Sequence, residues 1–255
     1  MADLVRCEPL SDGAFWRVTF GAPPGNILDL KTMAALADVF GRAAADRALK
    51  GICLEGAGAN FSYGASVEEH LPDRVEAMLA GMRRLVLAMV ESSVVVTAAV
   101  RGRCLGGGLE IASVCHRVFA SSDATLGQPE IALGVFAPVA SITLPGRVGR
   151  GRAEEVCLTG RPFSASEGKE AGLVDEVAPE PAEAAIAWMR AHLASRSASS
   201  LRLAVRAIRG DLVARLREDL PKLEALYLRE LMQTADATEG LKAFLEKRPP
   251  AWKDA

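Results

Sequence analysis

The sequence predicts an α/β protein, with a core of alternating strands and helices followed by a helical segment. Short runs rich in β-branched and aromatic residues alternate with longer runs whose apolar residues recur every three or four positions. Such alternation is typical of largely parallel strand pairing. The C-terminal third contains few strand-like runs and two long amphipathic stretches. Half of the 255 residues are apolar, which suffices for one sizeable core.

The expected elements follow these runs in chain order. Strands are predicted at residues 15–20, 51–56, 93–100, 118–120 and 125–127, and helices at residues 30–45, 75–91, 109–114, 182–195 and 201–245. The stretch 93–100 is rich in β-branched residues throughout, which is typical of a strand covered on both faces. Loops that contain glycine and proline separate the elements. We therefore expect an α/β core over residues 1–195 and, over residues 196–255, a helical segment suited to oligomer contacts.

Composition and charge narrow the class of protein. A net charge of −2 and a pI near 6.0 argue against a protein that grips nucleic acid through its overall charge. The five scattered cysteines include no C-x-x-C pair, which favours reduced thiols over a disulfide scaffold or zinc site. No apolar run approaches the roughly 20 residues of a membrane span, and the N-terminus lacks signal-peptide features. We expect a cytoplasmic protein with no metal, membrane or nucleic-acid partner.

Two glycine-bearing loops follow predicted strands. One spans residues 60–66, and the other, residues 106–108, opens the helix that carries Glu110. Glycines allow close approach of a ligand, and two free helix-start N–H groups on one oxygen would stabilise an oxyanion. A tight strand-to-helix turn explains the second loop equally well. No Gly-Lys-Ser/Thr follows, as a P-loop requires, and Ile111 stands where the dinucleotide fingerprint needs a glycine.

Two acidic residues lie beside these turns. Glu110 falls in a first helical turn, where a carboxylate also interacts favourably with the helix dipole. Glu130 follows Gln128 and Pro129 at a strand-to-helix junction, where a capping role is equally open. If the two strand ends are neighbours, the carboxylates could hold one water, one acting as base and the other as acid. Spacing alone leaves both interpretations open.

Four segments together resemble a known family. Residues 61–65 read FSYGA, residues 106–112 read GGGLEIA, and residues 127–134 read GQPEIALG. A fourth segment, residues 158–175, contains LTG and AGLVD. In this order and spacing they resemble the two oxyanion loops, the catalytic helix, the second-glutamate segment and a downstream stretch of the crotonase (enoyl-CoA hydratase/isomerase) superfamily. The resemblance extends over nearly the whole chain.

The resemblance implies a crotonase-like ββα spiral core and an enzyme that acts on a coenzyme-A thioester. By this resemblance the N–H groups of Ala65 and Gly107 form the oxyanion hole, and Glu110 and Glu130 are the catalytic carboxylates. Retention of both acids favours hydration over isomerisation, hydrolysis or dehalogenation. The family implies no cofactor beyond the coenzyme A of the substrate, and a homotrimer or homohexamer.

Two departures from straight-chain hydratases concern the acyl pocket. Ser66 stands where an Asp is usual, and Phe136 lies in a stretch that usually contains more Pro and Gly. The strings at residues 64–70 and 134–138 resemble the branch of the family that converts cyclohexa-1,5-diene-1-carbonyl-CoA to 6-hydroxycyclohex-1-ene-1-carbonyl-CoA in anaerobic benzoyl-CoA degradation. The expected substrate contacts are Tyr63, Ser66, His70 and Phe136.

Other functions remain open from the sequence. A general enoyl-CoA hydratase, or an isomerase or hydrolase of the same family, would share these motifs. A predicted helix carries Arg202, Arg206 and Arg209 along one side, where they could form a solvated or subunit face or contact coenzyme-A phosphates. A non-catalytic, RNA-binding member would use the same arginines with a steep salt dependence. His116 and His192 have no acid or cysteine constellation and are expected to be structural.

Overall fold

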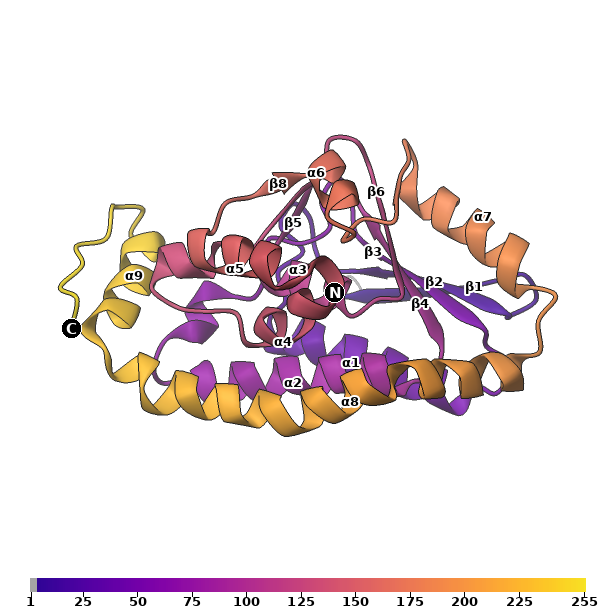
Figure 1. Cartoon of the computed structure of the whole chain (residues 1–255), viewed down its shortest axis with the longest axis horizontal. Helices are drawn as coiled ribbons and strands as arrows, with labels where there is room; N and C mark the ends of the chain where they lie inside the picture. Colours follow the sequence, from indigo (N-terminus) through magenta and orange to yellow (C-terminus); the bar gives the residue numbers. More distant parts are fainter. Residues whose placement is uncertain (1–3) are drawn as a thin grey trace.

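A computed structural model describes residues 4–255 (Figure 1). Residues 1–3, part of the stretch on which the signal-peptide expectation rests, lie outside the described residues. The central six-stranded sheet has the spatial order β1 (Val5–Leu10), β2 (Phe15–Phe20), β3 (Gly51–Gly56), β4 (Val95–Val100), β6 (Arg117–Ala120) and β9 (Glu176–Val177). β1 and β2 pair antiparallel, and from β2 to β9 every pairing is parallel. Parallel pairing requires crossover connections, which the helices supply.

The predicted strands are confirmed, with small changes of bounds. β2, β3 and β7 (Thr125–Gly127) begin and end where the sequence predicts. Every residue of β4 is buried, which explains its continuous apolar run. The sequence does not predict β1, because this edge strand has no buried residue and includes Glu8 and Pro9.

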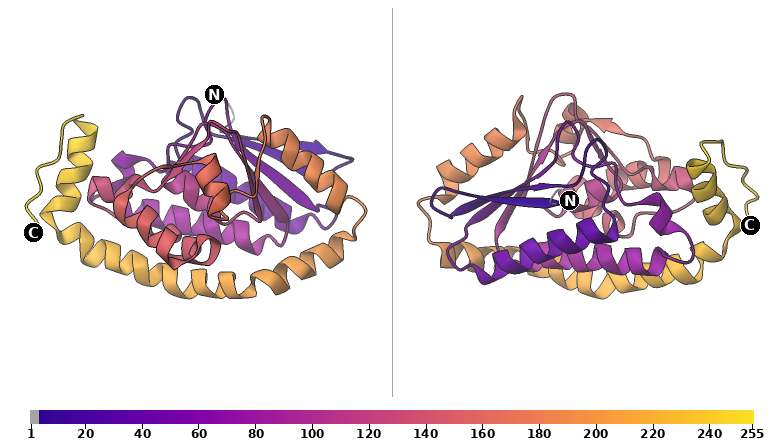
Figure 2. Two further views of the ribbon diagram at one scale, coloured as in Figure 1. Left: turned by 45° about the horizontal axis from the view of Figure 1, so that its top comes forward. Right: turned by 180° about the vertical axis from the view of Figure 1, so that it is seen from behind.

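Helices cover both faces of the central sheet (Figures 1 and 2). α1 (Leu30–Ala45) and α2 (Val75–Glu91) pack side by side on one face, with the predicted bounds. α7 (Pro181–Leu193) packs on the other face against β3 and β4. Because alternate strand residues point to opposite faces, two apolar clusters form, and the smaller one beneath α7 includes Phe119 and Met189.

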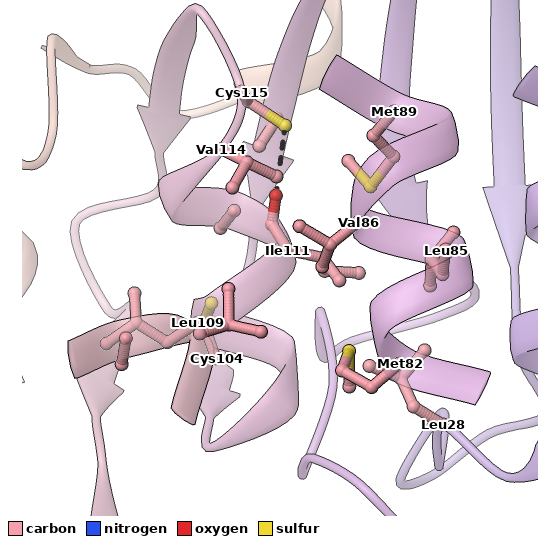
Figure 3. Close-up of a cluster of buried hydrophobic side chains, with 14 of the residues drawn as sticks. Leu28, Met82, Leu85, Val86, Met89, Cys104, Leu109, Ile111, Val114 and Cys115 are labelled. Carbon is pink, nitrogen blue, oxygen red and sulfur yellow. Dashed lines mark hydrogen bonds between the residues drawn. The ribbon is translucent and has the colours of Figure 1, made fainter. Parts of the chain in front are cut away.

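A small second sheet carries the turn into α3. β5 (Arg103–Leu105) pairs with β7, and the chain then passes through Gly106 into α3 (Gly107–Ser113). Gly106 has a φ of +53°, which residues with a side chain rarely adopt. All residues of α3 are buried, and Figure 3 shows Ile111 of this helix facing Val86 of α2. The glycine turn is thus anchored in the main core.

Short elements connect this turn to the C-terminal helices. They are η1 (Val67–His70), η2 (Pro129–Leu133), α4 (Pro138–Val148), α5 (Arg150–Thr159), β8 (Phe163–Ser164) and α6 (Ala165–Glu170). β8 completes the second sheet as the antiparallel partner of β7. α4 packs against α3, α5 and α8.

The C-terminal helices differ from the prediction of one helix over residues 201–245. α8 (Ala198–Arg229) runs along α2 and α4 for nearly the length of the molecule (Figure 1). The chain then forms η3 (Leu231–Gln233) and restarts as α9 (Ala235–Leu245). The prediction of one continuous helix is wrong, because the Thr234 hydroxyl accepts a hydrogen bond from a backbone N–H of α9 and so caps a new helix.

The predicted boundary at residue 195 falls in the turn between α7 and α8. The helices beyond it share the main apolar core, to which α8 contributes Leu216, Leu220 and Tyr227. No helix within residues 4–255 is long and apolar enough to span a membrane.

The expectation of a solvated arginine face on α8 is wrong for two of its three residues. Arg202 donates to the carbonyl oxygens of Ala43 at 2.7 Å and Ser92 at 3.1 Å, at the ends of α1 and α2. Arg209 donates to the Val114 carbonyl at 2.6 Å, at the end of α3. Helix C-termini leave carbonyl groups without intrahelical partners, and these guanidinium groups satisfy them. Arg206 is exposed.

Candidate functional site

Both candidate carboxylates line one pocket. The pocket lies between α2, α3, η2, the start of α4 and α8. Its apolar wall includes Met78 and Met82 of α2 and Leu220 of α8, together with Phe136, which lies between η2 and α4. A largely apolar cavity with a few converging polar groups is the usual form of a small-molecule site.

Glu110 enters the pocket from the first turn of α3. The residue is only 5% exposed, and its Oε1 accepts a hydrogen bond of 3.0 Å from the Ala140 N–H. Ala140 lies in the first turn of α4, so the positive end of that helix faces the carboxylate. Burial raises the pKa of Glu110 to about 7, against the opposing effect of the Ala140 and Val139 N–H groups.

Glu130 reaches the pocket from η2. A Cβ placed on Gly106 would lie 2.6 Å from its Oε1, so the carboxyl group lies against the turn that begins α3. Gln128, which is buried, directs its side-chain amide at Glu130, with one atom of the amide 2.9 and 3.1 Å from the carboxylate oxygens. The amide suits either charge state, since its nitrogen can donate to a carboxylate and its oxygen can accept from a carboxylic acid.

The two acids have different tendencies to ionise. Burial and, to a smaller extent, the negative charge of Glu110 together raise the pKa of Glu130 to about 8. Glu110 has the N–H group of Ala140 to stabilise its negative charge. We therefore infer that the proton shared by this coupled pair resides on Glu130 and that Glu110 is the ionised member.

The two predicted oxyanion residues also meet at this pocket, which Ala65 and Gly107 both line. A Cβ placed on Gly107 would lie 3.1 Å from the Ala65 nitrogen, so the two backbones are in close contact. Gly64, at φ +104°, turns the loop toward the start of α3. Neither the Ala65 N–H nor the Gly107 N–H donates a hydrogen bond to another group within residues 4–255. Two unpaired donors at one place can stabilise a developing oxyanion.

The four expected substrate contacts separate into two pairs. His70 and Phe136 line the pocket. The Nδ1 of His70 lies 2.7 Å from the Ser66 carbonyl oxygen, and burial lowers the pKa of this imidazole, so the ring is neutral. Ser66 and Tyr63 lie outside the pocket wall: Ser66 precedes η1, and Tyr63 is 42% exposed beside Asn60. Their substrate-binding roles stay predictions.

Sequence reasoning missed the polar residues that come from elsewhere in the chain. Tyr227 and Glu224 reach the pocket from α8, and Arg83 of α2 forms an ion pair with Glu224. The signal for Glu224 and Tyr227 was weak, because both fall within a long amphipathic stretch with no glycine motif beside them. Gln128 lies two residues before Glu130 in the sequence. Only the folded structure shows that its side chain is buried beside that carboxyl group.

The other two histidines, His116 and His192, contact the backbone and an aromatic side chain. His116 accepts a hydrogen bond of 3.0 Å from the Val96 N–H, and burial lowers its pKa to about 3. His192 stacks on Trp188 with ring centroids 5.3 Å apart. Neither lines the pocket, consistent with structural roles. Within residues 4–255, no three His, Cys, Asp or Glu side chains are grouped as a metal site requires.

Comparisons with known proteins agree with this geometry. The family model described as "Enoyl-CoA hydratase/isomerase" matches residues 12–255. The cyclohexa-1,5-dienecarbonyl-CoA hydratase of Thauera aromatica is 48% identical over 243 residues, which cover 95% of this chain and 94% of that one. The mevalonyl-coenzyme A hydratase of Aspergillus fumigatus is 34% identical over 78% of this chain and 76% of its own. The crystal structure of an enoyl-CoA hydratase from Mycobacterium avium subsp. paratuberculosis superposes with a TM-score of 0.85, at 29% identity and 99% coverage of both chains.

Proposed function

The chain belongs to the enoyl-CoA hydratase/isomerase family, and we propose that it adds water to cyclohexa-1,5-diene-1-carbonyl-CoA, in the anaerobic degradation of aromatic compounds. The family, the crotonase fold and the hydratase class of enzyme that the motifs predicted are confirmed. The observation that carries the proposal is the meeting of Glu110 and Glu130 in one pocket beside the Ala65 and Gly107 N–H groups. The similarity to the Thauera aromatica enzyme supports the ring substrate.

Binding polarises the substrate in the proposed reaction. The thioester oxygen accepts hydrogen bonds from the N–H groups of Ala65 and Gly107. These donors stabilise the negative charge that moves onto this oxygen when a nucleophile attacks the conjugated system. The apolar wall formed by Met78, Met82 and Phe136 holds the ring and excludes bulk water.

The two glutamates then handle the protons. Ionised Glu110 removes a proton from water as the water oxygen bonds to the ring carbon next to the thioester-bearing carbon. The double bond shifts to the other side of the thioester-bearing carbon, and protonated Glu130 supplies a proton to the far end of the diene. The ring has then gained one oxygen and two hydrogens, as 6-hydroxycyclohex-1-ene-1-carbonyl-CoA. The pair recovers its starting state when the proton on Glu110 passes to Glu130.

Oxygen-18 water tests the proposal. The purified protein is incubated with cyclohexa-1,5-diene-1-carbonyl-CoA, and with crotonyl-CoA in parallel, and the products are analysed by mass spectrometry. We expect one oxygen-18 atom in the hydroxylated ring product. Glu110→Gln and Glu130→Gln should each lower the rate by about 10²–10⁴-fold while the circular dichroism spectrum is unchanged.

Each alternative has its own outcome in this assay. Fast hydration of crotonyl-CoA without hydration of the diene would replace the ring substrate with a general enoyl-CoA. Conversion without label in the product would replace hydration with isomerisation. We further propose that the chain forms a homotrimer or homohexamer, which sedimentation analysis of the same preparation distinguishes from a monomer.

A further inference from the structure

Tyr227 is a buried polar residue that the mechanism above does not use. It projects from α8 into the wall of the pocket that contains both glutamates. The residue is 1% exposed and is among the largest fully buried side chains. Its ring packs on Phe136 with centroids 5.2 Å apart and planes inclined by 56°.

The hydroxyl of this tyrosine has no hydrogen-bond partner among residues 4–255. Leaving a buried hydroxyl unpaired is unfavourable, and most buried polar groups in proteins are paired. A phenylalanine would fill the same space against Phe136 without this penalty. The hydroxyl therefore points to a ligand that completes its hydrogen bonding within the pocket.

The surroundings make this hydroxyl a donor. Burial raises the pKa of Tyr227, and the negative charge of the Glu130–Glu110 pair adds to this effect. The phenol is thus held in its protonated form, which can donate a hydrogen bond. In the proposed reaction Glu110 takes a proton from water and Glu130 gives a proton to carbon. The lone pairs of the water oxygen can in addition accept a hydrogen bond from a donor such as the Tyr227 hydroxyl.

We propose that Tyr227 donates a hydrogen bond to the oxygen that is added to the ring, both in the attacking water and in the product hydroxyl. The inference rests on the proposed hydration. Glu110 approaches the site from α3 in the core and Tyr227 from α8, so the reacting oxygen has a base and a donor from separate elements. A donor fixed at this place favours ring thioesters that carry a hydroxyl at the reacting carbon over those that lack it.

Tyr227→Phe tests this, since it removes the hydroxyl alone. Binding is measured by calorimetry in the inactive Glu110→Gln background, with and without Tyr227→Phe. The two ligands are 6-hydroxycyclohex-1-ene-1-carbonyl-CoA and cyclohex-1-ene-1-carbonyl-CoA, which differ only in the hydroxyl. Loss of one neutral hydrogen bond should weaken binding of the hydroxylated ligand by roughly fivefold to tenfold and leave the other unchanged. Phe136→Leu, as the matched control for wall shape, should weaken both ligands to a similar extent.

The active enzyme supplies the second measurement. With Glu110 and Glu130 intact, Tyr227→Phe should lower kcat for the diene by roughly tenfold and change KM by less than about twofold. Equal weakening of both ligands, or an unchanged kcat and unchanged discrimination, would overturn the role of Tyr227 and leave the proposed hydratase standing. If the wild-type protein fails to hydrate the diene at all, the proposed function itself is wrong, and that result is seen before any Tyr227 variant is made.

Discussion

The two glutamates of the pocket are held in very different ways. Glu110 lies on α3, all of whose residues are buried in the main core. Glu130 lies on η2, a 3₁₀ turn whose residues are all partly exposed, although the carboxyl group of Glu130 is enclosed by the pocket. The first carboxylate is positioned by a helix packed in the main core, and the second by a turn that the C-terminal segment covers.

The C-terminal tail supplies several of the contacts that cover η2. Trp252 packs on Gly134 at the end of η2, where a Cβ would lie 3.1 Å from the indole. A Cβ on Gly240 of α9 would lie 2.2 Å from the Leu133 carbonyl oxygen, so α9 lies directly on η2. The carboxylate of Asp236 accepts from the Lys253 N–H at 2.7 Å and holds the tail in place. Substitutions around Glu110 should therefore affect mainly stability, and substitutions around Glu130 mainly activity.

Gly106→Ala should have the largest effect on the hydration rate, because Gly106 begins the turn into α3, which carries Glu110, and also lies against Glu130. A Cβ there would lie 2.6 Å from Glu130 Oε1, and the φ of +53° would be strained. We expect the hydration rate to fall by at least about 100-fold, since misplacement of a catalytic group by an ångström has effects of this size. Gly41→Ala in α1, where a Cβ meets no atom within 4 Å, is the control and should retain full activity. Similar rates for both variants would contradict the contact.

Met89→Ala should lower the unfolding free energy and leave kcat nearly unchanged, whereas Trp252→Ala should do the reverse. Met89 is 2% exposed in α2 near α3, so its truncation should cost about 2–5 kcal/mol of unfolding free energy. The kcat of the molecules that remain folded should change little. Trp252 is 44% exposed, so its truncation should cost under about 1 kcal/mol and yet lower kcat by roughly tenfold, through displacement of Glu130. Urea unfolding and initial rates check both, and parallel losses in the two variants would refute the separation.

The pH dependence of kcat should reflect the ionisation of Glu110 and Glu130. Hydration needs one protonated and one ionised glutamate, so kcat should peak between pH values of about 7 and 8, near the raised pKa values of Glu110 and Glu130. It should fall by about tenfold per pH unit on either side. A flat profile of the chemical step, measured by single turnover, would exclude the pair as acid and base.

Stability should depend on the same two groups. A carboxyl group whose pKa is raised by folding stabilises the protein fully below its unfolded value near 4.5, and this contribution is lost as the pH rises through about 7–8. Glu130→Gln removes one such group. We therefore expect its unfolding free energy to decline less than that of the wild type between about pH 6 and pH 9. An identical decline would show that Glu130 titrates normally.

The smallest effect on activity is expected in the first part of α8, where Arg202 and Arg206 lie outside the pocket wall. Arg202→Met removes the donors to the ends of α1 and α2 and should cost about 1–3 kcal/mol without a change in kcat. Arg206→Met, on the same helix but exposed, should stay within about 0.5 kcal/mol of the wild type. Equal losses at both positions would restore the solvated-face interpretation for Arg202.

Features that depend on neighbouring residues could be predicted from the sequence, and features that depend on contacts between distant segments could not. The bounds of α1 and α2 follow from apolar residues at helical spacing, a local property. Glu110 and Glu130 could be found because glycine and proline motifs stand beside them. Tyr227 could not, because its role depends on where α8 crosses the pocket, which no local pattern encodes. The break at Thr234 was missed because one capping hydroxyl looks like any polar residue of an amphipathic helix.

The course of α8 has a consequence for how acyl specificity can change. The proposed thioester donors and both glutamates come from residues before the helix, whereas Leu220, Glu224 and Tyr227 of α8 form one wall of the pocket. The glutamates and thioester donors are thus encoded in one stretch of the gene, and this wall of the pocket in another. Recombination that replaces α8 with the same helix of a relative, and keeps the segment after it that packs on η2, would exchange this wall, Tyr227 included, while both glutamates and the thioester donors remain.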